Sequence, residues 1–377
     1  MKARAPGKSG RRGATLYIML LVTPVILAMT VFAFETGYIA FVRSRLQNAA
    51  DAAALAGAAK LSTPYTQWSY PLVSASQKAN ILASAEQAAQ AEAARLAGLN
   101  GDGAVASYTL PASDVTFGFL DQNNAFTTPS PASQFPNSVV VTLHRDSHAN
   151  GSLKLLLGPI LGVRVTDLTA TARATVYSNP TTLRSLPGFQ SHILPVQLDV
   201  SAWNQFLANG TSVTENNQVL TGPNGALELR VYPDKTGGGH FGLLDLGPPA
   251  SSAPAFRNWI DNGASSSDVQ YLLDNGMLPV SPASNVPWGM GPGLKSTLIS
   301  NFQGAVGRKS FLPLSNGPGS GQIVGFAGVT INEAYGHGNN MVIAVQPMAV
   351  NDPTFAGGVP MGTGPLTFIF QPAKLTQ

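Results

Sequence analysis

The sequence predicts an α+β fold: a long N-terminal helix, a small domain of helices and antiparallel sheet, and a mostly β C-terminal domain. Three observations lead to this prediction. An uncharged apolar run near the N-terminus continues into an alanine-rich segment, and a second alanine-rich segment lies at 77–99. Beyond these, short apolar or alternating runs are separated by Gly, Pro and Asn turns. We expect four segments, at residues 1–13, 14–61, 62–180 and 181–377.

The composition limits the class of protein. Of the 377 residues 44% are apolar, enough to bury real cores, and only 11% are charged, against about 25% in an average soluble protein. Cysteine is absent, which excludes disulfides, thiolate metal ligands and a cysteine nucleophile. The net charge of +3 includes five basic residues among the first twelve, so the rest of the chain carries −2. The basic character is confined to one terminal segment, and we therefore expect no nucleic-acid partner.

The run Ala14–Phe34 is predicted to span a membrane. It has 21 residues and no charge, and at about 1.5 Å per residue it crosses a hydrocarbon core of ~30 Å. The positive-inside rule then places the preceding basic tail in the cytoplasm and the bulk of the chain in the periplasm or outside the cell. The five basic residues of that tail are Lys2, Arg4, Lys8, Arg11 and Arg12.

The alternative to a membrane anchor is a cleaved signal peptide. Its apolar region would have about 7–15 residues, with a small-residue cleavage site close behind. Here the run is longer, and the first such site lies near Ala54–Ala56. We expect an uncleaved, single-pass anchor.

The helix is predicted to continue beyond the membrane to residue 61. The segment Val42–Leu61 is dominated by Ala and Leu and contains no proline, so residues 14–61 form one helix of about 72 Å. Small residues follow one face of its outer half, which allows close helix–helix or helix–sheet packing and leaves little room for a ligand. The residues of this small face are Ala49, Ala50, Ala53 and Ala54.

Four groups of residues carry a resemblance to a known family: Arg11–Ala14, Pro24, Glu35–Gly37 and, above all, the run LQNAADAAALA at 46–56. They resemble the N-terminal signature of TadE/TadG-like proteins, which belong to the Tad (Flp) pilus assembly system of bacteria. The resemblance implies a membrane-anchored structural component of pilus assembly or related secretion machinery. Its implied partners are the membrane and other pilus-assembly proteins or copies of itself. Glu35-Thr36-Gly37 stands where many members have Asp-Val-Gly, and the von Willebrand-type domain of larger TadG proteins is not evident.

The candidate interaction residues all lie on the predicted helix. They comprise the small face, the polar trio Gln47, Asn48 and Asp51, and Glu35. A carboxylate within a membrane is by default a functional candidate. Because 21 apolar residues already span the bilayer, we expect Glu35 at the outer interface, with pairing to another subunit as the alternative.

The two outer domains are predicted from their patterns of apolar and turn residues. In the first we expect a helix at Gln77–Leu99, strands at Val115–Leu120, Ser138–His144 and Val163–Tyr177, an apolar bend at Leu153–Leu161 and a loop at Ser62–Pro71. In the second we expect strands at Ile193–Val200, Ala226–Tyr232, Gly242–Leu246, Ser310–Leu314, Gln322–Asn332, Met341–Pro347 and Leu366–Phe370. Helices are expected there at Pro254–Asp261, Ser267–Asp274 and Leu294–Gln303. Short strands between turns favour a sandwich or barrel-like body with inserted helices.

No catalytic, cofactor or metal site is predicted. His144 and His148 are four residues apart, a spacing that permits a metal pair on a helix, but His144 ends a strand and His148 lies in the next turn. We therefore expect the two histidines to lie apart. Asp199, Asp245 and Asp352 stand near strand ends, where turn or capping roles are usual, and no G-x-S-x-G elbow marks a serine nucleophile.

The sequence therefore predicts that the chain is not an enzyme. The alternative function is a membrane-tethered surface adhesin or glycan-binding module, with the β domain as the binding part. An anchored hydrolase is a third class.

Overall fold

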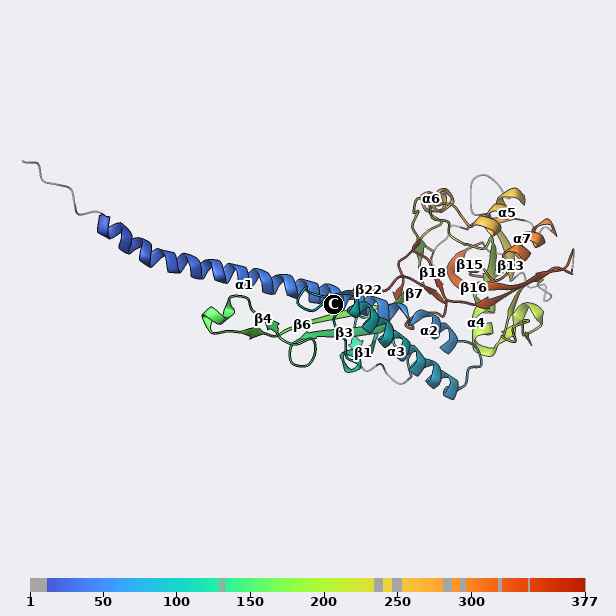
Figure 1. The fold of residues 1–377 in the computed structure, drawn as a ribbon. Helices are drawn as coiled ribbons and strands as arrows, with labels where there is room; N and C mark the ends of the chain where they lie inside the picture. The colour runs from blue at the N-terminus through green and yellow to red at the C-terminus, as the bar shows by residue number, and fades with distance from the viewer. Residues whose placement is uncertain are drawn as a thin grey trace, which may run out of the picture.

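The computed structural model describes residues 12–128, 130, 133–233, 240–245, 253–280, 287–291, 296–317, 321–337 and 340–376. It confirms the predicted α+β class: a long N-terminal helix leads into a helix-and-sheet domain and then into a mostly β domain (Figure 1). Of the predicted basic tail 1–13, only residues 12 and 13 belong to the described part.

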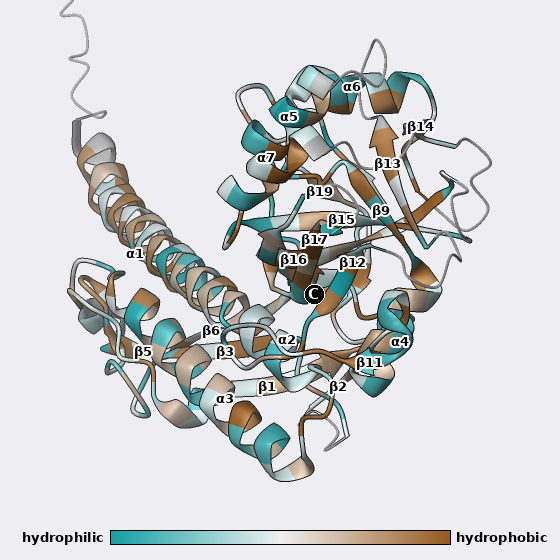
Figure 2. Ribbon diagram, turned by 90° about the vertical axis from the view of Figure 1, so that its right-hand side faces the viewer, coloured by the Kyte–Doolittle hydropathy of each residue, from teal (hydrophilic) through white to brown (hydrophobic). Residues whose placement is uncertain are grey.

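Helix α1 (Arg12–Ala59) has 48 residues and contains Pro24. Its N-terminal half projects away from both domains (Figure 1), and hydrophobic residues predominate along that half (Figure 2). The hydroxyls of Thr23 and Thr30 donate to the carbonyls of Met19 and Ile26, both at 2.8 Å. These two hydroxyls are thus satisfied inside the helix, as a hydrocarbon environment requires.

The first domain packs α1 against an antiparallel sheet and adds two further helices beside it. The helices are α2 (Ser62–Trp68) and α3 (Ala75–Gly98), and the strand order is β2 (Phe126–Thr127), β1 (Val115–Leu120), β3 (Ser138–Arg145), β6 (Leu168–Thr175) and β22 (Lys374–Thr376). Helix α3 begins with a capping box between Ser74 and Gln77. The predicted loop at Ser62–Pro71 is wrong over its first seven residues, which form α2. Tyr65 anchors this helix, because its buried ring contacts Phe135 with ring centroids 5.6 Å apart.

Small residues bring α1, α3 and the sheet close together. Strands β3 and β6 pair so that Val139 lies opposite Ala174 and Val141 opposite Ala172. The side chains of all four residues are buried. The small face of α1 packs against these two strands, and α3, whose alanines at 85, 89, 93 and 97 are buried, packs against α1. At Gly57 an added Cβ would lie 3.2 Å from the Ala89 carbonyl oxygen and 3.3 Å from Val139 Cγ1. The alanine spacing thus fixes how closely the three elements approach.

The second domain is built on a mixed seven-stranded sheet. Its order is β12 (Leu229–Tyr232), β17 (Val342–Pro347), β16 (Ile323–Tyr335), β15 (Lys309–Ser315), β9 (Val196–Asp199), β13 (Phe241–Asp245) and β14 (Gly289–Gly291), with β9 and β15 parallel. The helices are α4 (Val200–Asn209), α5 (Ala253–Asn262), α6 (Ser266–Asp274) and α7 (Ile299–Gly304). A smaller sheet has the order β18 (Val350–Asn351), β21 (Ile369–Phe370), β7 (Tyr177–Ser178) and β20 (Val359–Pro360). Two-stranded pairs join β8 (Thr182–Leu183) to β19 (Phe355–Ala356) and β10 (Thr211–Ser212) to β11 (Gln218–Val219).

Each of the seven strands predicted for this domain overlaps an observed strand. Sequence analysis missed α4, because the apolar run Ile193–Val200 reads as one strand. In the structure the strand ends at Asp199, whose carboxylate accepts a hydrogen bond from the Ser201 amide at 2.7 Å and caps the helix.

The chain returns to the first domain after completing the second. Strand β22 pairs antiparallel with β6, Leu375 lying opposite Ala174. The predicted boundary between residues 180 and 181 does not anticipate this return. The domains also share a hydrophobic core, where Phe370 of β21 lies edge-on to Tyr65 with centroids 6.1 Å apart.

Candidate functional site

Glu35 lies where the apolar run of α1 ends, and it binds a hairpin of the same chain. The hairpin consists of β4 (Leu153–Lys154), a 3₁₀ turn at Gly158–Leu161 and β5 (Val165–Thr166). Glu35 Oε1 accepts hydrogen bonds from the amides of Leu157 and Gly158, the latter at 2.9 Å. The other oxygen, Oε2, is buried and has no hydrogen-bond partner among the described residues. Glu35 is only 7% exposed, so within this chain its carboxylate serves to hold the hairpin.

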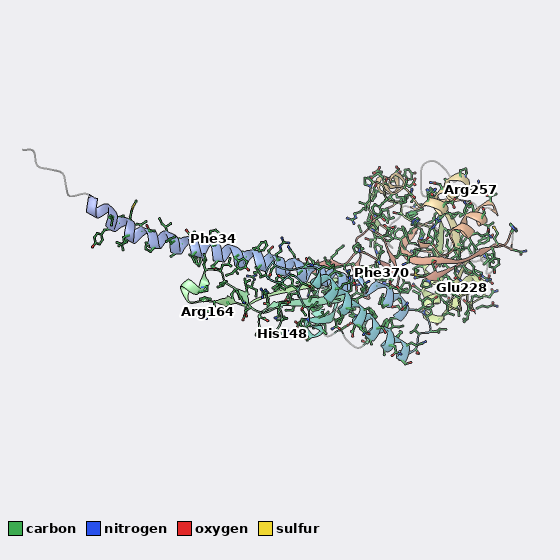
Figure 3. All side chains as sticks on the ribbon, viewed as in Figure 1. Phe34, His148, Arg164, Glu228, Arg257 and Phe370 are labelled. Carbon is green, nitrogen blue, oxygen red and sulfur yellow. The ribbon has the colours of Figure 1, made fainter. Side chains whose placement is uncertain are left out.

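The hairpin extends the exposed apolar surface of α1. Leu156 is 72% exposed, and Val163 and Val165 are each about half exposed. Exposed cationic side chains flank them, Lys154 and Arg164 on the hairpin. Figure 3 shows Arg164 beside the part of α1 that carries Phe34, the last residue of the apolar run. The apolar surface of the hairpin and that of the helix therefore end at about the same level.

The polar trio divides between the chain's own sheet and solvent. Gln47 donates from its amide nitrogen to Asp51 Oδ1 at 2.8 Å and to the Thr171 carbonyl of β6 at 3.2 Å. Asn48, in contrast, is exposed. Of the three, Asn48 alone has a side chain turned mainly to solvent, so it is the member best placed to meet another molecule.

The four alanines of the small face are fully buried within the chain. Their neighbours are α3 and strands β3 and β6, which make the close packing described above. That these residues contact another protein stays a prediction; the contacts that the structure shows for them are intramolecular.

Sequence analysis identified Asn48 but missed two exposed residues on the same face of α1. Phe41, Arg45 and Asn48 are exposed, and their spacing places them on one side of the helix. The Arg45 guanidinium lies 5.3 Å from the centre of the Phe41 ring, a cation–π contact. We call these three residues the stalk face. The sequence did contain a signal for this face. Once the alanine stripe is assigned to the core, these three residues lie on a side of α1 that the core does not use.

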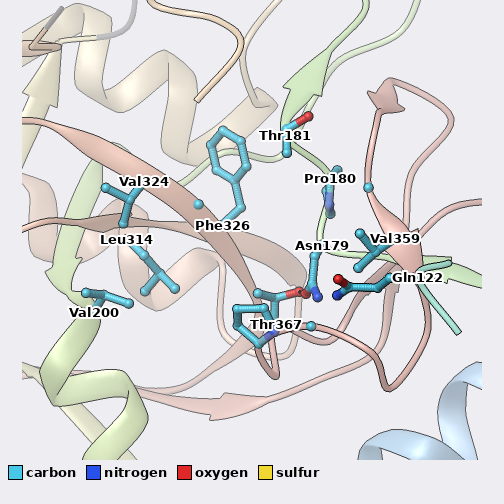
Figure 4. Close-up of a pocket in the computed structure, with 14 residues that line it drawn as sticks. Gln122, Asn179, Pro180, Thr181, Val200, Leu314, Val324, Phe326, Val359 and Thr367 are labelled. Carbon is cyan, nitrogen blue, oxygen red and sulfur yellow. Dashed lines mark hydrogen bonds between the residues drawn. The ribbon is translucent and has the colours of Figure 1, made fainter. Parts of the chain in front are cut away.

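The second domain contains a cavity of about 330 Å³ where it meets the first domain (Figure 4). Its lining includes Gln122 from the first domain, Asn179 and Pro180 from the connection, and Leu314 and Phe326 from the large sheet. Among the described residues that line it, none is charged. The described tryptophans of this domain, at 203, 259 and 288, are all buried and present no ring for stacking on a sugar.

The predicted turn and capping roles of the aspartates are confirmed at two positions. Asp199 caps α4, and Asp352 Oδ1 accepts from the Thr354 amide at 2.8 Å. The side chain of Asp245 lies outside the described part of the chain.

The expectation that His144 and His148 lie apart is wrong. Their ring centroids are 4.7 Å apart, and both face Asp114. The turn after β3 is tighter than expected, because Asp146 Oδ1 accepts from the His148 amide at 2.7 Å and folds His148 back over the strand end.

Residues 13–60 match the family described as "Putative Flp pilus-assembly TadE/G-like". The match confirms the resemblance at the N-terminal region, and it covers α1 rather than the two domains. No curated protein and no solved structure matches the chain. Helix α1 is long and apolar enough to cross a membrane, and none of its most apolar window is buried. These findings support a single-pass membrane protein with a role related to Tad pilus assembly.

Proposed function

We propose that the chain is a structural component of Tad (Flp) pilus assembly or of a related secretion machinery, and that it acts through protein contacts rather than catalysis. The observation that carries the proposal is the family match over the helix that also holds the exposed apolar run. In this proposal the N-terminus is cytoplasmic and both domains are extracytoplasmic, in line with the basic residues that precede the span.

The stalk face is the surface that we assign to partners. The small face is occupied by the chain's own α3 and sheet, whereas the stalk face begins just after the apolar run and has its side chains exposed. An aromatic ring and an arginine are the residue types that most often anchor protein interfaces. Another pilus-assembly protein or a second copy of the chain is the proposed occupant.

The hairpin is a second point of contact with the membrane in this proposal. Glu35 fixes it to α1 at the end of the apolar run, so Leu156 and Val163 reach the lipid interface. The flanking cationic side chains suit the anionic headgroups of that region.

Loss of pili in cells that lack this chain, restored by the full-length chain, tests the proposal directly. The partner surface is tested by cross-linking, for which the chain is convenient because it has no cysteine. A cysteine in place of Asn48 should cross-link in piliated cells to a Tad component or to a second copy, identified by mass spectrometry. A cysteine in place of Ala79, which is also exposed but lies on α3, is the matched control. Normal piliation without the chain would refute the proposal.

The intact mass of the protein in the membrane fraction distinguishes the anchor from a cleaved signal peptide. We expect the full-length mass, and release into the medium after cleavage near Ala56 would overturn the anchor. The adhesin alternative predicts instead that cells lacking the chain keep their pili and lose attachment.

A further inference from the structure

A cluster of nitrogen and oxygen donors lies on the surface of the first domain, far along the chain from the residues assigned to pilus assembly. Asp114 ends the 3₁₀ turn before β1, His144 is near the end of β3, and His148 is in the turn that follows. Because β1 and β3 pair antiparallel, with Val115 opposite Val141, the start of one strand lies beside the end of the other. Figure 3 shows His148 at the surface of this domain.

The donor atoms have the spacing of a metal site. His148 Nε2 lies 3.0 Å from both carboxylate oxygens of Asp114, and His144 Nε2 lies 3.8 Å from Asp114 Oδ2. One donor atom from each of the three residues can be chosen so that all lie within 4.8 Å of one another. Ligands of a tetrahedral zinc ion stand about 3.3 Å apart, as bond lengths of about 2.0–2.2 Å require. Small side-chain rotations would therefore bring the three donors around one ion.

A second carboxylate prepares His144 as a ligand. His144 Nδ1 lies 2.9 Å from Asp146 Oδ2. An ionised carboxylate only accepts hydrogen bonds, so Nδ1 is the nitrogen that donates to Asp146. In the neutral imidazole Nε2, the atom on the Asp114 side, then has the lone pair that can bind a metal. Such a carboxylate–histidine pair is the usual outer support of a metal-binding imidazole.

The turn that carries these groups is held from inside the domain. The buried Arg145 guanidinium pairs with Asp102 at 2.9 Å and donates to the carbonyls of Asn150, Gly151 and Ser152. Asn150 in turn donates from its side chain to the His144 carbonyl at 2.8 Å. The positions of His144 and His148 are thus set by buried contacts, although their rings reach the surface.

We propose that Asp114, His144 and His148 form a divalent metal site, with Asp146 as a positioning residue. Two imidazoles and one carboxylate suit Zn²⁺ rather than the all-oxygen preference of Mg²⁺ or Ca²⁺. Three protein ligands leave one position for water or an outside ligand, and the His148 side chain, 50% exposed, leaves that position open to solvent. A bound ion would join the start of β1 to the end of β3 and so stabilise this end of the strand pair.

The test is zinc binding by the full-length chain, purified in detergent with any affinity tag removed and titrated with ZnCl₂. We expect saturable binding of one ion and a rise in Tm on adding Zn²⁺, with no rise on adding the same concentration of Mg²⁺. The variant His148→Ala should abolish both effects, and it should fold because the side chain is half exposed. Asp146→Asn should weaken the affinity for Zn²⁺ by about 10–100-fold.

The matched control is His337→Ala, which removes an exposed histidine of the second domain and should leave zinc binding unchanged. Absence of saturable binding in the unaltered chain would overturn the proposal. Binding that survives the double change His144→Ala and His148→Ala would also overturn it, because the ion would then be held elsewhere. None of these outcomes depends on whether the chain acts in pilus assembly.

Discussion

The carboxylate of Glu35 accepts a hydrogen bond from the backbone amide of Gly158 at 2.9 Å, and this contact fastens the hairpin to α1 at the end of the apolar run. The backbone amide of Leu157 donates to the same carboxylate oxygen. One acidic side chain thereby sets the position of a hairpin that begins more than a hundred residues later in the chain.

Replacing Glu35 with alanine should release the hairpin without unfolding the domain. Hydrogen bonds to a charged group contribute about 2 kcal/mol, so exchange of the Leu157 and Gly158 amides should accelerate by about 30-fold. Hydrogen–deuterium exchange with mass spectrometry measures the hairpin peptide. Glu92→Ala, which removes a half-buried carboxylate of α3 that pairs with Arg95, is the control. Equal exchange in the two variants would show that Glu35 does not hold the hairpin.

Replacing Leu156 with cysteine and attaching an environment-sensitive fluorophore should report lipid contact. In liposomes the label is expected to shift to shorter wavelength and to be quenched by brominated lipids, because Leu156 lies level with the end of the apolar run. Leu99 is 69% exposed, close to the 72% of Leu156, but follows α3 in the first domain. A label at Leu99 should remain in water; identical spectra at the two sites would contradict the membrane contact.

The substitution Ala53→Leu should destabilise the first domain. Ala53 is fully buried among α3 and the sheet, and extra methylenes in such a packed core cost about 1–3 kcal/mol. Thermal unfolding followed by circular dichroism should show a lower Tm, with the chain still in the membrane and pilus assembly reduced. Ala59→Leu adds the same atoms at the exposed end of α1 and should leave Tm unchanged. Normal stability and piliation of Ala53→Leu would refute the packing role.

Acid should weaken the first domain through Asp102. Burial raises the pKa of this carboxyl, but hydrogen bonds from the Val105 amide, the Arg145 guanidinium and the Ala104 amide outweigh it, and the pKa is lowered. A carboxyl with a lowered pKa in the folded state stabilises that state above its unfolded pKa of about 3.9. This stability is lost as the pH falls through the folded-state pKa.

The variant Asp102→Asn should be less stable at pH 7 by about 3 kcal/mol, because it leaves the buried Arg145 charge without its partner. The stability of this variant should also change less than that of the unaltered chain between about pH 5 and pH 2. This range includes the ordinary carboxyl pKa of about 4. Thermal unfolding across this range measures both effects. Parallel pH profiles for the two proteins would exclude Asp102 as a source of the acid sensitivity.

The predictable parts of the fold are those with long local patterns. Helix α1 and strands β1 and β3 were found almost to the residue because composition and alternation extend along the whole element. Strand β22 has three residues, and its pairing with β6 depends on chain reversal across the whole second domain. No local pattern carries that information.

The sites show the same division. Glu35 binds two backbone amides. Nearly every residue has a backbone amide, so no sequence motif could predict which ones Glu35 would bind. The histidine pair could have been anticipated, since Asp146-Ser-His148-Ala-Asn150-Gly is rich in residues that build tight turns. Asn150 has a φ of 63°, in the left-handed region that asparagine tolerates. The two rings meet because of this tight turn, and not because of the helical spacing of four residues.

The return of β22 to the first domain has a consequence for biogenesis. Residues 176–373 lie between β6 and β22, two paired strands of the first domain, so the second domain is topologically an insertion. The edge of β6 that β22 covers is unpaired until all of those residues have been synthesised and, in a translocated protein, have crossed the membrane. Until then that strand edge is a template for wrong pairing. A chaperone that covers the edge of β6 during export would prevent such pairing.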